Sequence, residues 1–231
     1  MSQIARSTTN HRRRLEVLKQ IAFWMLVLLF FRVVFLVVIE YRNYFPANFE
    51  SNFLSGREAN FFGLYRSAFY AHIISGPFCL LIAAFLMFSG KKRSLGKWHR
   101  WLGKTLSILV LLVMLPSGFI MATQAFTGLI AGISFYLLTL ITAFCVGIAS
   151  WHASQRRFAI HQLWATRSFI LLCSPLLLRL MTGATIVSGF ENEWTYRFAA
   201  WGSWLIPLTV FEIRRQQTQR SRFRSSKEVV T

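Results

Sequence analysis

Long apolar runs separated by short polar segments dominate this chain of 231 residues. A helix rises about 1.5 Å per residue, so a run of roughly twenty apolar residues is long enough to cross about 30 Å of hydrocarbon. Six such runs can be delimited, at residues 21–39, 67–89, 101–122, 128–149, 163–187 and 194–213. The pattern predicts an all-α polytopic membrane protein, a bundle of six transmembrane helices.

The first run and the polar segment after it need separate interpretation. Residues 21–39 are too long for a signal-peptide core, and no small-residue cleavage site follows, so we expect an uncleaved first span. In the next segment phenylalanines recur every four residues from Phe45 to Phe53, with Pro46 suited to a helix start and Gly56 to a helix stop. This spacing predicts a short helix in the headgroup layer, with an ordinary loop as the alternative.

The distribution of charge predicts the orientation. Of the 26 lysines and arginines, twenty lie in the N-terminus, the turns after the second and fourth runs, the first residues of the runs that follow those turns, and the tail, whereas five of the eight acidic residues lie in the opposite loops. Loops that stay in the cytoplasm carry the excess of basic residues. Both termini are therefore predicted to be cytoplasmic.

The same reading divides the chain into three parts. We expect a basic cytoplasmic N-terminus at 1–20, a membrane domain at 21–213 and a basic, disordered cytoplasmic tail at 214–231, all in a protein of the cytoplasmic membrane. The net charge of +18 is spread over loops between apolar runs rather than over one surface. Anionic headgroups on the cytoplasmic face are therefore the predicted partners, and nucleic acid is not.

Composition narrows the chemistry. All eight acidic residues are glutamates, which argues against aspartyl-phosphate chemistry and paired-aspartate proteolysis. The three cysteines lie in apolar runs without CxxC spacing, so they predict neither a disulfide framework nor a thiolate metal site. No glycine-rich phosphate loop and no nucleophile with a matching base is visible. The sequence therefore does not decide whether the protein is an enzyme.

Three polar residues fall in the outer half of the predicted spans. Arg32, His72 and Arg179 lie within apolar runs, where a charge costs roughly 2.5 to 3.5 kcal/mol on insertion scales. Together they suggest a site for an anionic or carbonyl-bearing ligand or a lipid. The alternatives are that Arg32 snorkels to headgroups, that Arg179 binds backbone carbonyls freed by Pro175, and that the small-residue face around His72 serves helix packing.

A second polar cluster opens the third and fifth spans at the cytoplasmic side. Its members are His99, Arg100, His161, Trp164 and Arg167. Interfacial tryptophans and lipid-facing arginines are the usual interpretation of such span ends. The alternative is a b-type haem with His99 and His161 as axial ligands and arginines beside its propionates, with His152 able to replace either histidine. No other metal site is indicated.

Several short stretches carry a resemblance to a known family. HIISGP at 72–77, HRWLG at 99–103, SG at 117–118, HQLWATRS at 161–168 and LRL at 178–180 occur in this order. The chain resembles the predicted multi-pass membrane proteins catalogued as domain of unknown function 2306. The resemblance implies a membrane bundle with these histidines and arginines at characteristic positions and implies no established activity. The family pattern has arginine where this chain has Gln162.

Three functions remain open at this point. The leading hypothesis is a membrane protein that binds a small ligand or lipid within the bundle. The first alternative is a redox protein that carries one b-type haem at His99 and His161 and exchanges electrons with a quinone near His72 and Arg179. The second is a small-molecule transporter, which the lack of membrane-embedded acids disfavours.

Overall fold

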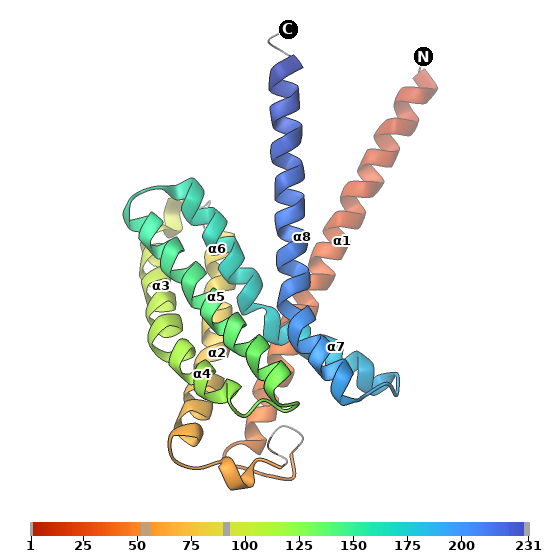
Figure 1. The fold of residues 1–231 in the computed structure, drawn as a ribbon. Coiled ribbons are helices and arrows are strands. Elements are labelled where there is room, and N and C mark those ends of the chain that lie inside the picture. The colour runs from red at the N-terminus through yellow and green to blue at the C-terminus, as the bar shows by residue number, and fades with distance from the viewer. Residues whose placement is uncertain (1, 52–53, 55, 90–92, 229–231) are drawn as a thin grey trace. The chain divides into compact units, whose positions relative to one another are not determined.

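A computed structural model describes residues 2–51, 54, 56–89 and 93–228, and the chain divides into two units, 1–58 and 59–231. Every regular element in the described residues is a helix (Figure 1), which confirms the all-α prediction. Five helical stretches are long and apolar enough to cross a membrane: Glu16–Asn43, Gly63–Ser89, Gly96–Ala122, Leu129–Ser154 and Phe158–Val187. They coincide with the first five predicted spans.

The first unit is one long helix followed by turns. Helix α1 spans Ser2–Glu40 and continues into a 3₁₀ turn at Tyr41–Asn43. The predicted short helix is wrong over the described residues, because turns follow instead. The Asn48 side chain accepts a hydrogen bond from the backbone N–H of Glu50 at 2.9 Å, a local bond that competes with helix formation. Phe53, part of the predicted helix, lies outside the described residues.

The second unit contains all the remaining long helices. They are α2 Gly63–Ser89, α3 Gly96–Ile108, the π-helical segment Leu109–Met114, α4 Leu115–Ala122, α5 Leu129–Ser154, α6 Phe158–Leu172, α7 Ser174–Val187 and α8 Glu193–Glu228. Short 3₁₀ turns stand at Glu58–Asn60 and Arg93–Leu95.

Four spans form a ring in this unit. Helix α2 packs against α3 and α4 on one side and α6 on the other, and α5 completes the ring between α3/α4 and α6 (Figure 1). Helices α3 and α6 therefore stand diagonally across the bundle, joined mainly through their common neighbours. Helices α7 and α8 pack together beside this ring, and α8 also contacts α5 and α6.

Two prolines explain the irregularities of the spans. Pro116 lacks the backbone N–H of a helical residue, and its ring clashes with a regular preceding turn, so the third span widens into the π-helical segment just before it. Pro175 follows the break at Cys173, where the fifth span divides into α6 and α7. Both breaks occur at the positions where proline makes a continuous helix most costly.

Hydroxyl groups connect α8 to its neighbours. Ser134 of α5 donates to the Ala200 carbonyl at 2.9 Å and accepts from the indole N–H of Trp204 at 3.0 Å. The hydroxyls of Ser174 and Ser203 lie 2.9 Å apart between α7 and α8. All of these residues are buried, as is common for small polar residues that link membrane helices.

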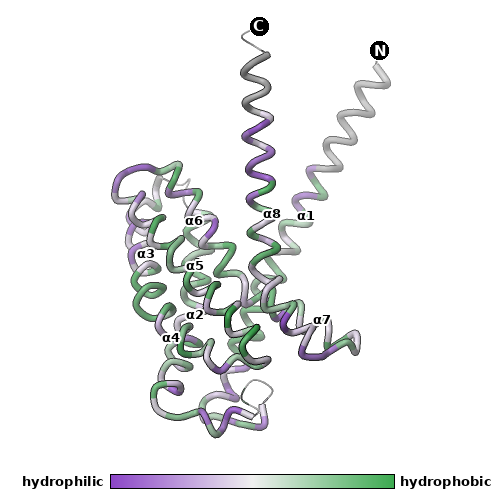
Figure 2. The backbone as a smooth tube through the Cα atoms, viewed as in Figure 1, coloured by the Kyte–Doolittle hydropathy of each residue, from purple (hydrophilic) through white to green (hydrophobic). Residues whose placement is uncertain are grey.

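Helix α8 differs from its predicted counterpart in two ways. The predicted sixth span at 194–213 is not among the five apolar stretches, because Arg197, several tryptophans and small polar residues lower its mean hydropathy. Figure 2 shows the helix becoming more hydrophilic toward its C-terminal end. Residues 214–228 are helical where the sequence predicts a disordered tail. Arginine and glutamine favour helix, and the preceding turns of α8 remove the cost of starting a new one.

Gly132 allows the end of α4 to approach α5. A Cβ atom at this buried position would lie 2.9 Å from the carbonyl oxygen of Ala122, which belongs to the backbone and cannot rotate away. At Gly183 of α7, by contrast, an added Cβ would meet no atom within 4 Å.

We therefore predict opposite effects for two glycine substitutions. Gly132→Ala should destabilise the protein by about 1–3 kcal/mol through overpacking. Gly183→Ala should leave stability unchanged or raise it by up to about 1 kcal/mol through helix propensity. Thermal unfolding of the purified variants in one detergent checks both values. Equal melting temperatures for the two variants would contradict the close approach at Gly132.

Candidate functional site

Two histidines of the second polar cluster, His99 and His161, meet across the bundle. We call the end of the bundle that holds them the inner end. His99 lies in the first turn of α3 and His161 in the first turn of α6, and their ring centroids are 6.4 Å apart with an interplanar angle of 80°. Both side chains are partly buried. Since α3 and α6 stand on opposite corners of the ring, the imidazoles meet near the axis of the bundle. The structure thus brings together the two residues that the sequence paired.

The C-terminal part of α5 orients His161. Its Nδ1 lies 2.8 Å from the carbonyl oxygen of Ala149, which can only accept, so Nδ1 carries the proton. The neutral ring therefore has its free lone pair on Nε2. A carbonyl bonded to the far nitrogen is the usual arrangement for a histidine that ligates a metal. Sequence reasoning missed this bond, because Ala149 contributes only its backbone.

His99 has a comparable partner on α2. Its Nδ1 lies 3.3 Å from the hydroxyl of Ser89, which is buried at the C-terminal end of that helix. The Ser89 hydroxyl also lies 3.5 Å from the Leu86 carbonyl, an acceptor toward which it can direct its proton. Ser89 then accepts from Nδ1 of His99, and over the residues that the structure describes the Nε2 atoms of both histidines make no hydrogen bond.

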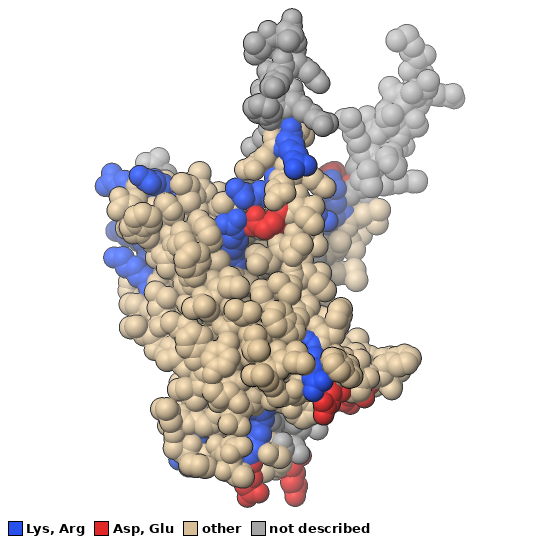
Figure 3. All heavy atoms as spheres, viewed as in Figure 1, with Lys and Arg blue, Asp and Glu red and all other residues tan. Residues whose placement is uncertain are grey.

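Arg100 lies apart from its neighbour His99. Successive residues of a helix are separated by about 100° around its axis, and Arg100 is exposed on α3 whereas His99 is partly buried. Lys97 and Lys104 are exposed on the same helix. Figure 3 shows Lys and Arg side chains gathered at this edge of the molecule.

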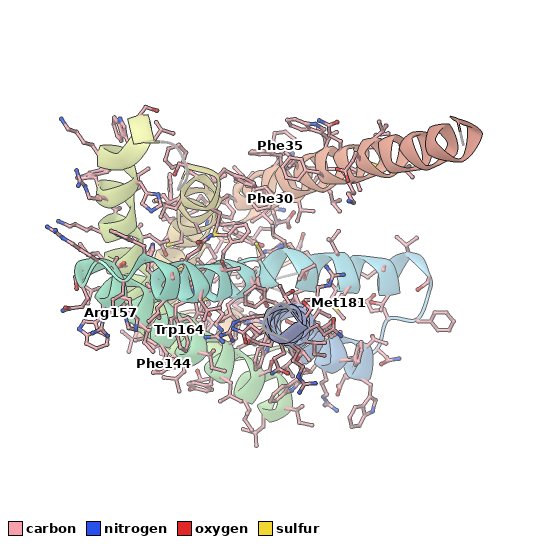
Figure 4. All side chains as sticks on the ribbon, turned by 90° about the horizontal axis from the view of Figure 1, so that it is seen from above. Phe30, Phe35, Phe144, Arg157, Trp164 and Met181 are labelled. Atoms are coloured by element: carbon pink, nitrogen blue, oxygen red, sulfur yellow. The ribbon has the colours of Figure 1, made fainter. Side chains whose placement is uncertain are left out.

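Arg167 and Trp164 take part in packing against α8. Arg167 donates through Nε to Glu212 at 2.7 Å, and its guanidinium lies 4.3 Å from the centroid of the Trp164 ring. Arg215 adds a second ion pair to Glu212 at 3.3 Å. Trp164 also contacts Phe144, with 5.7 Å between ring centroids; both are labelled in Figure 4. Sequence reasoning missed Glu212 as the partner, although it is the acidic residue nearest the cytoplasmic end of the last predicted span.

His152, near the C-terminal end of α5, contributes a third imidazole at this end of the bundle. Its ring contacts Trp151, with 5.0 Å between centroids, and its buried Nδ1 has no hydrogen-bond partner among the described residues. No group of three or more His, Cys, Asp or Glu residues in the described part of the chain is arranged to hold a metal ion.

His72 lies in a separate polar cluster of the same unit. Its Nδ1 is 3.1 Å from the hydroxyl of Ser117, which itself donates to the Val113 carbonyl, so Ser117 accepts from His72. A Cβ at Gly118 would lie 3.5 Å from the His72 ring and 2.9 Å from the hydroxyl oxygen of Thr139. Close contact with α4 supports the packing interpretation of this face of α2.

The two arginines of the proposed outer site have different surroundings. Arg179 is exposed on α7 and donates to the Pro175 carbonyl of its own helix at 3.4 Å. The missing N–H of a proline frees the carbonyl four residues before it rather than its own, so this bond leaves the backbone alternative a prediction. Arg32 is exposed on α1, in the other unit. Neither is within ion-pair distance of a carboxylate among the described residues. His72 and Arg179 thus bond to different helices, and no described contact joins them.

Comparison with known proteins identifies a family and nothing finer. A family model described as "Predicted membrane protein (DUF2306)" matches residues 69–214, which is more than half of the chain. The match includes both inner-end histidines, His72, Arg179 and Glu212. Neither the comparison with curated proteins nor the comparison with solved structures finds a match.

The half-buried ion pair of Arg167 and Glu212 should stabilise the α6–α8 contact. Their side chains are 16% and 27% exposed. Glu212→Gln leaves two arginines without a carboxylate, so we expect a loss of about 1–3 kcal/mol. This corresponds to a melting temperature lower by roughly 2–10 °C.

Glu193→Gln is the matched control. Glu193 pairs with Arg197 at the same 2.7 Å distance, but its side chain is 70% exposed. Such exposed pairs contribute about 0–1 kcal/mol. A control variant that loses as much stability as Glu212→Gln would contradict a special role for the α6–α8 pair.

Proposed function

The chain belongs to the DUF2306 family of predicted membrane proteins, and on that premise we propose that it binds one b-type haem between His99 and His161 and carries single electrons in the membrane. The family establishes a multi-pass membrane protein and brings no activity with it. The geometry of the two histidines is what favours this function over the others.

The separation of the rings is the observation that carries the proposal. An imidazole nitrogen lies about 2 Å from a bound metal, so two imidazoles on opposite sides of one iron have ring centres roughly 6 Å apart. The observed separation is 6.4 Å. The porphyrin supplies four ligands itself, so two histidines complete the iron coordination.

The hydrogen bonds and charges of this end also support the proposal. Both Nδ1 atoms are bonded, to Ala149 and Ser89, which leaves Nε2 as the ligand atom on each ring. Haem also carries two propionates, which need cations or water. Arg157 is exposed directly before α6, one turn from His161, and is the cation on that helix best placed to serve them.

The outer half of the bundle has less support as a ligand site. His72 is bonded to Ser117, and Arg179 is bonded to Pro175 of its own helix. No described contact brings these polar groups together into one site. We therefore prefer the inner-end pair as the functional site.

We further propose that the protein crosses the cytoplasmic membrane six times with both termini in the cytoplasm. Helix α8 contacts α5 through Ala200 and Trp204 and α6 through Glu212, so it runs along most of the bundle. From Glu193 to Glu212 it is long enough to span about 30 Å. Glu212 pairs with Arg167 near the basic α5–α6 turn, which supports placing the end of α8 on the cytoplasmic side.

A reduced-minus-oxidised absorption spectrum tests haem binding. Wild-type protein purified from cells supplied with haem should show a Soret band and a b-type difference spectrum. His99→Ala and His161→Ala should each abolish that spectrum. His99→Met should retain a band with a higher reduction potential, because Met/His ligation raises the potential of haem iron.

His72→Ala is the matched control for that experiment. It removes another histidine whose Nδ1 is hydrogen-bonded, but at a different cluster. The band should survive in this variant. A flat spectrum from folded wild-type protein, or a band that persists in both His99→Ala and His161→Ala, would overturn the haem proposal.

Cysteine labelling tests the orientation. In a background with the native cysteines replaced by alanine, Ser94→Cys and Glu191→Cys place reactive groups at exposed positions on opposite sides of the predicted bilayer. A membrane-impermeant maleimide should label the Glu191 position in intact cells and the Ser94 position only after the membrane is opened. The reverse labelling would refute the topology.

A further inference from the structure

One face of α3 carries three cations that the protein itself does not neutralise. Lys97, Arg100 and Lys104 follow one another at intervals of three and four residues, which places them on one side of the helix. All three side chains are exposed. Within the described part of the chain, none of them forms an ion pair.

Three arginines near other span ends are paired. Arg167 and Arg215 share Glu212, and Arg197 pairs with Glu193. The chain thus provides acidic partners for cations that face neighbouring helices. On α3 no acidic residue occurs between Gly96 and Ile108, and no carboxylate of the described residues forms an ion pair with this face, which leaves it available to an external anion.

Tryptophans accompany the cations. Trp98 and Trp101 are 60% and 61% exposed, and their rings lie edge to face with centroids 6.4 Å apart. Tryptophan concentrates at the boundary between hydrocarbon and headgroups, where its ring is in lipid and its N–H is in water.

The same face becomes apolar further along the span. Ile108 and Leu112 follow Lys104 at four-residue intervals and are 56% and 70% exposed. Cations that alternate with tryptophans over 97–104, followed by exposed aliphatic side chains at Ile108 and Leu112, are the pattern of a helix that passes from the headgroup layer into hydrocarbon. The cations therefore lie at the level of lipid phosphates rather than deep in the aqueous phase.

We propose that the exposed surface of α3 formed by Lys97, Arg100, Lys104, Trp98 and Trp101 binds the phosphodiester headgroup of an anionic phospholipid. Lysine and arginine provide the positive charge, and the two indole rings pack against the glycerol and upper acyl region. The site involves no group of the His99–His161 pair. A negative result in the haem experiment would therefore not contradict the lipid site, and a negative result in the lipid experiment would not contradict haem binding.

Native mass spectrometry with an equimolar mixture of phosphatidylglycerol and phosphatidylcholine tests the proposal. Wild-type protein in detergent should retain phosphatidylglycerol preferentially. Each cation near a charged membrane surface contributes roughly a fivefold gain in affinity, so the triple variant Lys97→Gln, Arg100→Gln, Lys104→Gln should lose about a hundredfold. The preference of the wild type should also weaken as ionic strength rises.

Two further variants make the result specific. Arg156→Gln with Arg214→Gln removes two exposed cations, one from the adjacent α5–α6 turn and one from α8, and should reduce the preference much less. Lys97→Arg with Lys104→Arg keeps the charge and should bind like the wild type. The proposal is overturned if the triple variant keeps its preference, or if the Arg156/Arg214 variant loses as much.

Discussion

The hydrogen bond from His161 to the Ala149 carbonyl is the constraint on which the inner end of the bundle depends. It joins the last turns of α5 to the first turn of α6 and turns the imidazole toward the diagonal helix α3. A backbone acceptor fixes the tautomer without adding a second titrating group. The position of His161 therefore depends on the main chain, and a mutation of Ala149 that keeps the helix would preserve it.

Charge is used in two ways in this protein. Arg167 and Arg215 gather on Glu212, where a half-buried carboxylate holds α6 and α8 together. The α3 cations are exposed and have no acidic residue on their own helix. Burial separates the two uses, because a desolvated arginine needs a fixed partner whereas an exposed one can take its partner from the surroundings.

The sequence predicted the helical spans more completely than it predicted the contacts between side chains. Apolar runs located the first five spans, because length and hydropathy are local properties of the sequence. The same criterion placed a sixth span at 194–213, but the corresponding part of α8 is not among the five apolar stretches. It is joined to its neighbours by hydrogen bonds such as that between Trp204 and Ser134. Matching depth on two helices paired His99 with His161. Their backbone and hydroxyl partners carried no motif, and the pairing of Arg167 with Glu212 joins residues 45 positions apart. After the first span, the four-residue spacing of phenylalanines predicted a helix, but the described residues form turns. There the side chain of Asn48 accepts a hydrogen bond from the backbone of Glu50.

The π-helical segment Leu109–Met114 divides the third span into two α-helices, α3 and α4. Ser117 donates its hydroxyl to the Val113 carbonyl and accepts from His72. Ser75 of α2 also lies 3.1 Å from the sulfur of Met114. Helix α2 therefore contacts the third span at the end of its π-helical segment. Helix α3, before the π-helical segment, carries His99, whereas α4, after it, carries Ser117, which is hydrogen-bonded to His72. The two polar clusters of the bundle therefore draw on one span, with His99 before its π-helical segment and Ser117, the partner of His72, after it.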